Sequence, residues 1–169
     1  KLKNEKVKVT GLINAAGISS MNLAVATTPN MTQSIIQTNL VGTIYCCQIF
    51  SPLMFRNKSG SIINFSTIAV PLGLKGESVY VASKAGIEGF SRSFAREAAD
   101  FNVRVNCIAP GPINTDLLKG VSSEQIDRIV SQQVIPKQFI PADVCDLVEL
   151  LLDNKSASLS GQVLNVGGA

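Results

Sequence analysis

Short apolar runs alternate with longer amphipathic segments along this chain. Four apolar runs that end in small or turn-forming residues indicate buried β-strands: 7–17, 60–67, 103–112 and 161–166. Three segments carry apolar residues at helical spacing: 30–55, 78–100 and 141–153. The alternation of strand and helix predicts an α/β layered fold in which helical crossovers join parallel strands.

The intervening segments predict a loop and one further helix. The stretch Val70–Ser78 is rich in Gly and Pro and is expected to be a loop. The letters SSEQ at Ser122–Gln125 resemble a capping box that opens a helix. The sequence contains no internal repeat, low-complexity segment or linker, so we expect a single domain over residues 1–169.

Three of the predicted strands end in polar or glycine-rich residues. These ends read NAAG at Asn14–Gly17, Ser66-Thr67, and APGP at Ala109–Pro112. In open parallel sheets, ligands bind beyond the carboxyl ends of the strands. The sequence therefore predicts a binding site formed jointly by these three strand ends.

Composition narrows the function classes. The 169 residues are 46% hydrophobic and 16% charged with a net charge of +3, which fits a globular protein and is too mild for a nucleic-acid partner. The chain contains no histidine, which excludes Ser-His-Asp hydrolases, Cys-His hydrolases and histidine-bound catalytic metals. Acid–base chemistry must therefore come from Tyr, Lys, Asp, Glu or Cys.

Cysteine usage and hydropathy bear on the compartment. Cys46, Cys47, Cys107 and Cys145 form no C-x-x-C pair and are expected to be free thiols in a reducing compartment. No apolar run of about 18 residues indicates a membrane span, and no signal peptide opens the sequence. We therefore expect a cytoplasmic protein with no membrane partner and no metal.

The stretch YVASK places Tyr80 and Lys84 four residues apart, in a chain with only two tyrosines. On a helix this spacing puts both side chains on one face. The pair could be a proton-transfer device, or an ordinary pair on the surface of a helix. Spacing alone does not choose between these two interpretations.

Six ordered motifs resemble the short-chain dehydrogenase/reductase family over nearly the whole chain. They are NAAG at Asn14–Gly17, TNL at Thr38–Leu40, IINFST at Ile62–Thr67, YVASK at Tyr80–Lys84, RVNCIAPGPINTD at Arg104–Asp116, and SGQVLNVGG at Ser160–Gly168. Within the family the segment is most similar to the 3-oxoacyl-[acyl-carrier-protein] reductase and carbonyl reductase group. The resemblance implies a Rossmann-like doubly wound parallel sheet in three α/β/α layers. It also implies an NAD(P)-dependent oxidoreductase that reduces a carbonyl to an alcohol.

The resemblance assigns catalytic roles to four residues. Tyr80 would be the general acid, and Lys84 would lower its pKa and hold the nicotinamide ribose. Thr67 stands where the family has a serine and would orient the substrate carbonyl, with impaired activity or a bulge that presents Ser66 as the alternatives. Asn39 would bend its helix locally and complete a proton relay.

The resemblance also implies a cofactor site and a lid. NADP or NAD is expected, with NADP favoured by resemblance only, and ten residues would hold it: Asn14, Ala15, Ala16, Gly17, Tyr80, Lys84, Pro110, Gly111, Ile113 and Thr115. The segment Asp116–Lys137 resembles the mobile lid over the substrate. Five of its apolar residues could line an acyl site or simply pack: Leu117, Leu118, Ile126, Ile129 and Val130.

The family's first β-α units and their glycine-rich phosphate turn, G-x-x-x-G-x-G, have no counterpart before Asn14. We therefore expect a fragment, or a chain with an unseen preceding part. The alternative function is a non-catalytic binding or assembly subunit or an inactive fragment, and the alternative location is the mitochondrial matrix if a targeting segment precedes Lys1.

Partners follow from the same resemblance. We expect a small carbonyl or acyl substrate, and a homo-oligomer (dimer or tetramer) that packs through segments 30–55 and 78–100. An acyl carrier protein is a weaker expectation, because Ser61 and Phe101 stand where carrier-protein reductases have basic residues. Arg56, Lys58 and Arg104 are nearby but not equivalent.

Overall fold

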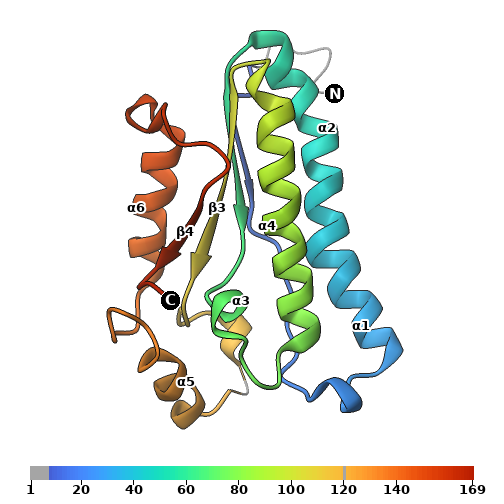
Figure 1. Cartoon of the computed structure of the whole chain (residues 1–169), viewed down its shortest axis with the longest axis vertical. Helices are drawn as coiled ribbons and strands as arrows, with labels where there is room; N and C mark the ends of the chain where they lie inside the picture. The colour runs from blue at the N-terminus through green and yellow to red at the C-terminus, as the bar shows by residue number, and fades with distance from the viewer. Residues whose placement is uncertain (1–7, 120) are drawn as a thin grey trace.

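Four parallel strands form one sheet in the computed structural model, which describes residues 8–119 and 121–169 (Figure 1). The strands lie side by side in chain order: β1 (Gly11–Asn14), β2 (Gly60–Phe65), β3 (Val103–Pro110) and β4 (Val163–Val166). Val7, the first residue of the run predicted as the first strand, lies outside the described residues. The parallel sheet confirms the α/β prediction.

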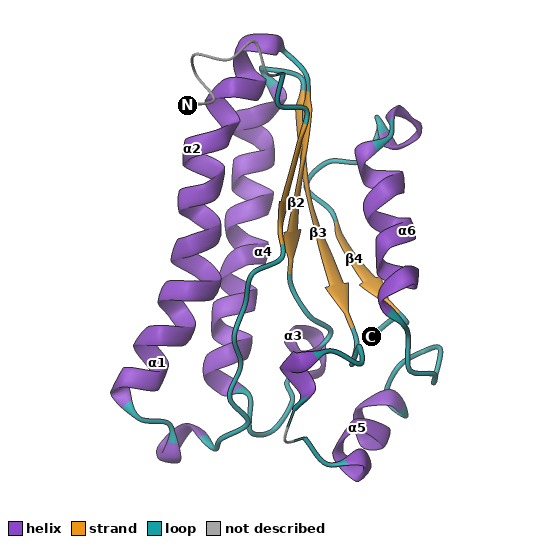
Figure 2. Cartoon of the chain, turned by 180° about the vertical axis from the view of Figure 1, so that it is seen from behind, coloured by secondary structure: helices purple, strands orange, loops and turns teal. Residues whose placement is uncertain are grey.

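Helices cover both faces of this sheet. One face is covered by α4 (Ser78–Ala99) and by a continuous helical stretch made of α1 (Pro29–Ile35), η2 (Ile36–Val41) and α2 (Gly42–Asn57). The other face is covered by α6 (Pro141–Leu152), as Figure 2 shows from behind. The three-layer, Rossmann-like arrangement is therefore the predicted one.

Each face of the sheet has its own apolar core. Ile62 and Ile63 are neighbours on β2, and both are fully buried. Because successive strand residues point to opposite faces, Ile62 packs in the core beneath α2 and α4 and Ile63 in the core beneath α6. Burying each isoleucine stabilises the fold by about 2–3 kcal/mol, which explains the continuous apolar runs in the sequence.

Five shorter elements complete the fold: η1 (Ala24–Ala26), α3 (Ala69–Leu72), η3 (Asp116–Leu118), α5 (Ser123–Val130) and η4 (Asn154–Ser156). The capping box at the start of α5 is confirmed, because the Ser122 side chain accepts from the Gln125 backbone N–H and the Gln125 side chain accepts from the Ser122 N–H. No helix in the described part of the chain is long and apolar enough to cross a membrane.

The structure adds detail to two local predictions. The helix predicted over 30–55 contains a π-helical turn at Ile36–Val41, at the residue where the resemblance implied a local bend, and Asn39 makes tertiary hydrogen bonds from that turn. The predicted loop Val70–Ser78 begins inside α3, a single helical turn that ends at Gly73 in the left-handed conformation. A four-residue helix is too short to show an apolar period.

Candidate active site

A cavity of about 450 Å³ opens beyond the carboxyl ends of β1, β2 and β3. Gly17, Thr67 and Gly111, which follow these strands, all line its wall. This volume lies in the range of small-molecule sites, roughly 300–1,000 Å³. The structure therefore brings the three predicted strand ends to one cavity.

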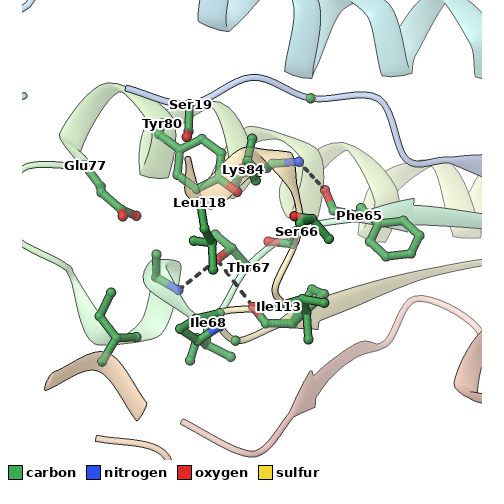
Figure 3. Close-up of a pocket in the computed structure, with 18 of the residues that line it drawn as sticks. Ser19, Phe65, Ser66, Thr67, Ile68, Glu77, Tyr80, Lys84, Ile113 and Leu118 are labelled. Carbon is green, nitrogen blue, oxygen red and sulfur yellow. Dashed lines mark hydrogen bonds between the residues drawn. The ribbon is translucent and has the colours of Figure 1, made fainter. Parts of the chain in front are cut away.

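Tyr80 and Lys84 lie one turn apart on α4 and enter this cavity from the same side (Figure 3). Their side chains are largely buried, with exposed fractions of 8% and 5%. The Lys84 Nζ atom donates a hydrogen bond to the Phe65 carbonyl over 2.8 Å and lies 5.8 Å from the centre of the Tyr80 ring. The pair is therefore built into the site and is not a surface pair.

Burial changes the proton affinities of both groups. It lowers the pKa of Lys84 to about 8, because water is replaced by apolar neighbours. Burial, followed by the charge of Glu77, raises the pKa of Tyr80 to about 12, against a lowering contribution from the hydrogen bond with Thr67. Desolvation therefore dominates the pKa of Tyr80 in the protein alone, and the lowering expected from Lys84 beside a bound cofactor stays a prediction.

The hydroxyl groups of Ser66 and Thr67 have different surroundings. Ser66 Oγ donates to the Glu88 carboxylate over 2.7 Å, and Glu88 is itself held by Arg92. Thr67 Oγ1 accepts from the Ala69 N–H at 3.2 Å and lies 3.5 Å from the Pro110 carbonyl. Both residues follow β2 without a bulge inside it. The geometry leaves Thr67, not Ser66, as the hydroxyl next to Tyr80.

Asn39 is fully buried in the π-helical turn η2 and does not line the cavity. Its Oδ1 atom accepts from the Ile18 N–H at 2.8 Å, and its Nδ2 atom donates to the Ile18 carbonyl and to Ser83 Oγ. A methyl group at Gly17 would lie 3.4 Å from both Asn39 Oδ1 and Lys84 Nζ. Asn39 therefore fixes the loop that passes in front of Lys84.

Eight of the ten residues expected at the cofactor line the cavity: Ala15, Gly17, Tyr80, Lys84, Pro110, Gly111, Ile113 and Thr115. Asn14 and Ala16 do not line it. The Asn14 side chain turns into the protein, where its Nδ2 atom lies 2.8 Å from Asn64 Oδ1 and 3.3 Å from Cys47 Sγ. Asn14 thus ties β1 to β2, and its expected place beside the cofactor stays a prediction.

The lid segment contributes only part of its expected residues. Leu117, Leu118 and Ile129 line the cavity, and Ile126 and Val130 do not.

Glu77 was not predicted from the sequence, and it lines the same cavity one turn before Tyr80. Its spacing from Tyr80 was the available signal. Among the described residues, no cluster of Cys, Asp and Glu could hold a metal, and the four cysteines are free.

Comparison with known proteins identifies the family. The family model described as enoyl-(acyl carrier protein) reductase matches residues 1–168. The chain is 35% identical over 157 residues to a 3-oxoacyl-[acyl-carrier-protein] reductase of Staphylococcus aureus, covering 93% of this chain and 64% of that protein. It is 36% identical over 167 residues to carbonyl reductase family member 4 of Xenopus laevis, covering 99% of this chain and 69% of that protein.

A solved structure agrees with these matches. A short chain dehydrogenase/reductase family protein superposes with a TM-score of 0.88 at 28% identity, covering 99% of this chain and 69% of that chain. The chain thus spans about two thirds of the length of the proteins it matches. Its sequence and its parallel sheet agree with these matches, and the chain belongs to the short-chain dehydrogenase/reductase family of oxidoreductases.

Proposed function

We propose that this chain is the substrate-side part of an NAD(P)-dependent reductase that converts a carbonyl to an alcohol. The observation that carries the proposal is the buried pair of Tyr80 and Lys84, which shares one cavity with the Thr67 hydroxyl. Residues 1–169 act as a single domain that corresponds to the part of the family fold after its first β-α units. The relatives named above are reductases, which supports the same reaction class.

The cavity wall fits the nicotinamide end of a dinucleotide. Ala15, Gly17 and Gly111 are small, and a side chain at Gly17 would fill the space beside Lys84 Nζ. When bound, the reduced nicotinamide supplies a hydride to the carbonyl carbon. Lys84, Ile113 and Thr115 would hold this end of the cofactor, and resemblance favours NADP over NAD.

The residues of the chain supply the proton and the orientation. Tyr80, with its pKa raised to about 12, carries its proton at neutral pH and donates it to the carbonyl oxygen as the general acid. Thr67 Oγ1 orients that oxygen by a hydrogen bond. Lys84, with its pKa lowered to about 8, is still mostly cationic at pH 7 and favours the tyrosinate that forms. Asn39 positions the loop at Ile18 and the Ser83 hydroxyl, and we assign it to the proton relay behind Lys84.

The substrate we propose is a small carbonyl or acyl compound. A carrier protein is less well supported, because Ser61 is buried and donates to the Leu151 carbonyl, and Phe101 stacks on Phe55 at 4.2 Å between ring centres. Arg104 donates to the carbonyls of Leu151, Asp153 and Leu159 and so caps the end of α6. Ser61 and Phe101 carry no positive charge, and the Arg104 guanidinium is engaged with backbone carbonyls. We further propose a cytoplasmic homo-oligomer.

The test is oxidation of NADPH and NADH in the presence of a panel of ketones and 3-oxoacyl thioesters, followed by absorbance. Tyr80→Phe is expected to lower kcat by about 100- to 10,000-fold, the usual contribution of a positioned acid. Tyr45→Phe is the matched control, because Tyr45 is the other tyrosine and is 54% exposed on α2. Equal rates for Tyr80→Phe and the wild type would refute the assignment. No binding of either cofactor would favour a non-catalytic binding or assembly subunit.

A further inference from the structure

Glu77 places a carboxyl group in a cavity wall that is otherwise largely apolar. It stands at the N-cap position of α4, three residues before Tyr80, and lines the cavity. In Figure 3 its carboxyl oxygens point toward the side of the cavity where Thr67 and Leu118 lie. The function proposed above gives this side chain no role.

The Glu77 carboxyl has no partner in the described part of the chain. The ion pairs among residues 8–119 and 121–169 join Arg92 to Glu88 and Lys119 to Asp116. Glu77 also makes no side-chain hydrogen bond to cap its own helix. Glu88 provides the contrast, since the same residue type two turns beyond Tyr80 is held by both Ser66 and Arg92.

The Glu77 side chain is half-buried in the cavity wall and open to a ligand in the cavity. Ile68, Leu74 and Leu118 line the same cavity, and burial raises the pKa of Glu77. A ligand that carries a hydrogen-bond donor can bind this carboxyl in place of water. An ionised carboxylate accepts such a bond, and a protonated carboxyl still accepts at its carbonyl oxygen.

We propose that Glu77 is a specificity-determining residue that selects carbonyl substrates bearing a hydroxyl or ammonium group close to the reacting carbonyl. The proposal rests on the reductase function proposed above, whose substrate class it narrows. The donor must lie close to the carbonyl because Glu77 stands one turn before Tyr80 at the start of α4 and both side chains line the cavity. The same carboxylate disfavours substrates with an anionic group at that position, by like-charge repulsion.

The test compares four carbonyl compounds that share an ethyl group on the carbonyl carbon and differ in the group on its other side. They are 1-hydroxy-2-butanone, 1-amino-2-butanone, the apolar analogue 3-pentanone, and the anionic analogue 2-oxobutanoate. The wild type is expected to favour the hydroxyketone over 3-pentanone in kcat/KM by about 10- to 100-fold, as a hydrogen bond to a charged group gives. A further gain for the aminoketone would indicate that an ammonium group is the preferred donor.

Glu77→Gln keeps the shape of the side chain and removes its charge. It is expected to reduce the preference for the hydroxyketone over 3-pentanone by about tenfold and to raise kcat/KM for 2-oxobutanoate relative to 3-pentanone, because any change in the acidity of Tyr80 is common to all four substrates. Glu97→Gln is the matched control, because Glu97 is exposed on the same helix. Unchanged substrate ratios in Glu77→Gln would overturn the proposal.

A binding measurement separates this proposal from the reductase function. Saturation-transfer NMR on the full chain detects the four ketones without any need for turnover. If no ketone is reduced but Glu77→Gln still weakens the binding of the hydroxyketone relative to 3-pentanone, the reductase assignment fails and the proposed role of Glu77 stands. If ketones are reduced in a Tyr80-dependent manner with equal preference in wild type and Glu77→Gln, the proposed role of Glu77 fails and the reductase assignment stands.

Discussion

At the scale of single residues, Lys84 shows the cost of building a site inside a protein. Lys84 is 5% exposed, and within the described part of the chain its ammonium group donates a hydrogen bond to one carbonyl, that of Phe65. The folded state therefore prefers the neutral amine more than water does, which lowers the pKa from 10.5 to about 8. Lys84 thus opposes folding while it serves the proposed chemistry.

Replacing Lys84 by Met should therefore stabilise the chain and abolish its reductase activity. Because the folded pKa of about 8 lies below the unfolded value of 10.5, the cost of the charge is complete below pH 8 and disappears as the pH rises to 10.5. After allowing for the lost hydrogen bond to Phe65, Lys84→Met should gain about 2 kcal/mol of unfolding free energy at pH 7. Urea unfolding at pH 7 and pH 10 measures it, and a variant no more stable at pH 7 would contradict the prediction.

Thr67 allows a separate prediction about the hydroxyl group. Thr67→Val keeps the branched shape but cannot donate to a substrate carbonyl, so kcat should fall by about 10- to 100-fold. Thr67→Ser keeps the hydroxyl and should stay within about threefold of the wild type. Ser66→Ala is the control for the neighbouring hydroxyl, which is committed to Glu88. If Ser66→Ala is the more damaging variant, Ser66 and not Thr67 orients the substrate.

At the scale of elements, the π-helical turn η2 connects the helical layer to the site. It turns Asn39 inward so that one amide satisfies both backbone groups of Ile18, as a neighbouring strand would. The loop after β1 is thereby held next to Lys84 although it has no regular structure of its own. The element that departs from regular helix geometry is thus the one that positions the loop.

Asn39→Ala should loosen this loop. It leaves the N–H and carbonyl of Ile18 without their partner, so the unfolding free energy should fall by about 2–4 kcal/mol. Ser83→Ala removes only one of the Asn39 hydrogen bonds and should cost about 1 kcal/mol. Hydrogen exchange of the Ile18 amide supplies the local readout. An unchanged exchange rate in Asn39→Ala would show that the loop is held by other contacts.

The sequence predicted the strands and helices that have long apolar runs or a long helical spacing of apolar residues. It did not show the local geometry that tertiary contacts determine. The strand pair Ile62-Ile63 and the helix of Tyr80 and Lys84 follow from apolar runs and from helical spacing. The π-helical turn at Asn39 does not follow from apolar spacing, and only the resemblance to the family implied a local bend at this residue. The orientation of Asn14 toward Asn64 was likewise hidden, since a strand-end motif does not show which way a side chain turns.

The candidate site was predictable to a similar extent. Three strand ends had to meet at one edge of a parallel sheet, and Thr67, Gly111 and Tyr80 do share one cavity. Glu77 was not predicted, because a single acidic residue before a helix is ordinarily a helix-cap or surface residue. Its role depends on the apolar wall around it, which only the folded chain brings together.

At the scale of the whole molecule, the layer of α2 and α4 leaves an apolar outer face. Tyr45 and Ile49 lie one turn apart on α2 and are 54% and 66% exposed. Gly89 on α4 has no heavy atom within 4 Å of the position a side chain would take, so open space lies beside it. Exposed apolar side chains on α2 and the open surface at Gly89 on α4 fit the proposed packing against a second copy of the chain.

The oligomer gives the last prediction, and light scattering coupled to gel filtration measures it. The wild type should elute as a dimer or tetramer, and Ile49→Lys should weaken the association at least tenfold, because it buries a charge in the contact. Val25→Lys is the matched control, since Val25 is 96% exposed in η1 and outside α2 and α4. If Val25→Lys dissociates the oligomer and Ile49→Lys does not, the contact lies on another face. A wild type that is monomeric at every concentration, while still binding cofactor, would mean that this face meets solvent and that the site needs no partner.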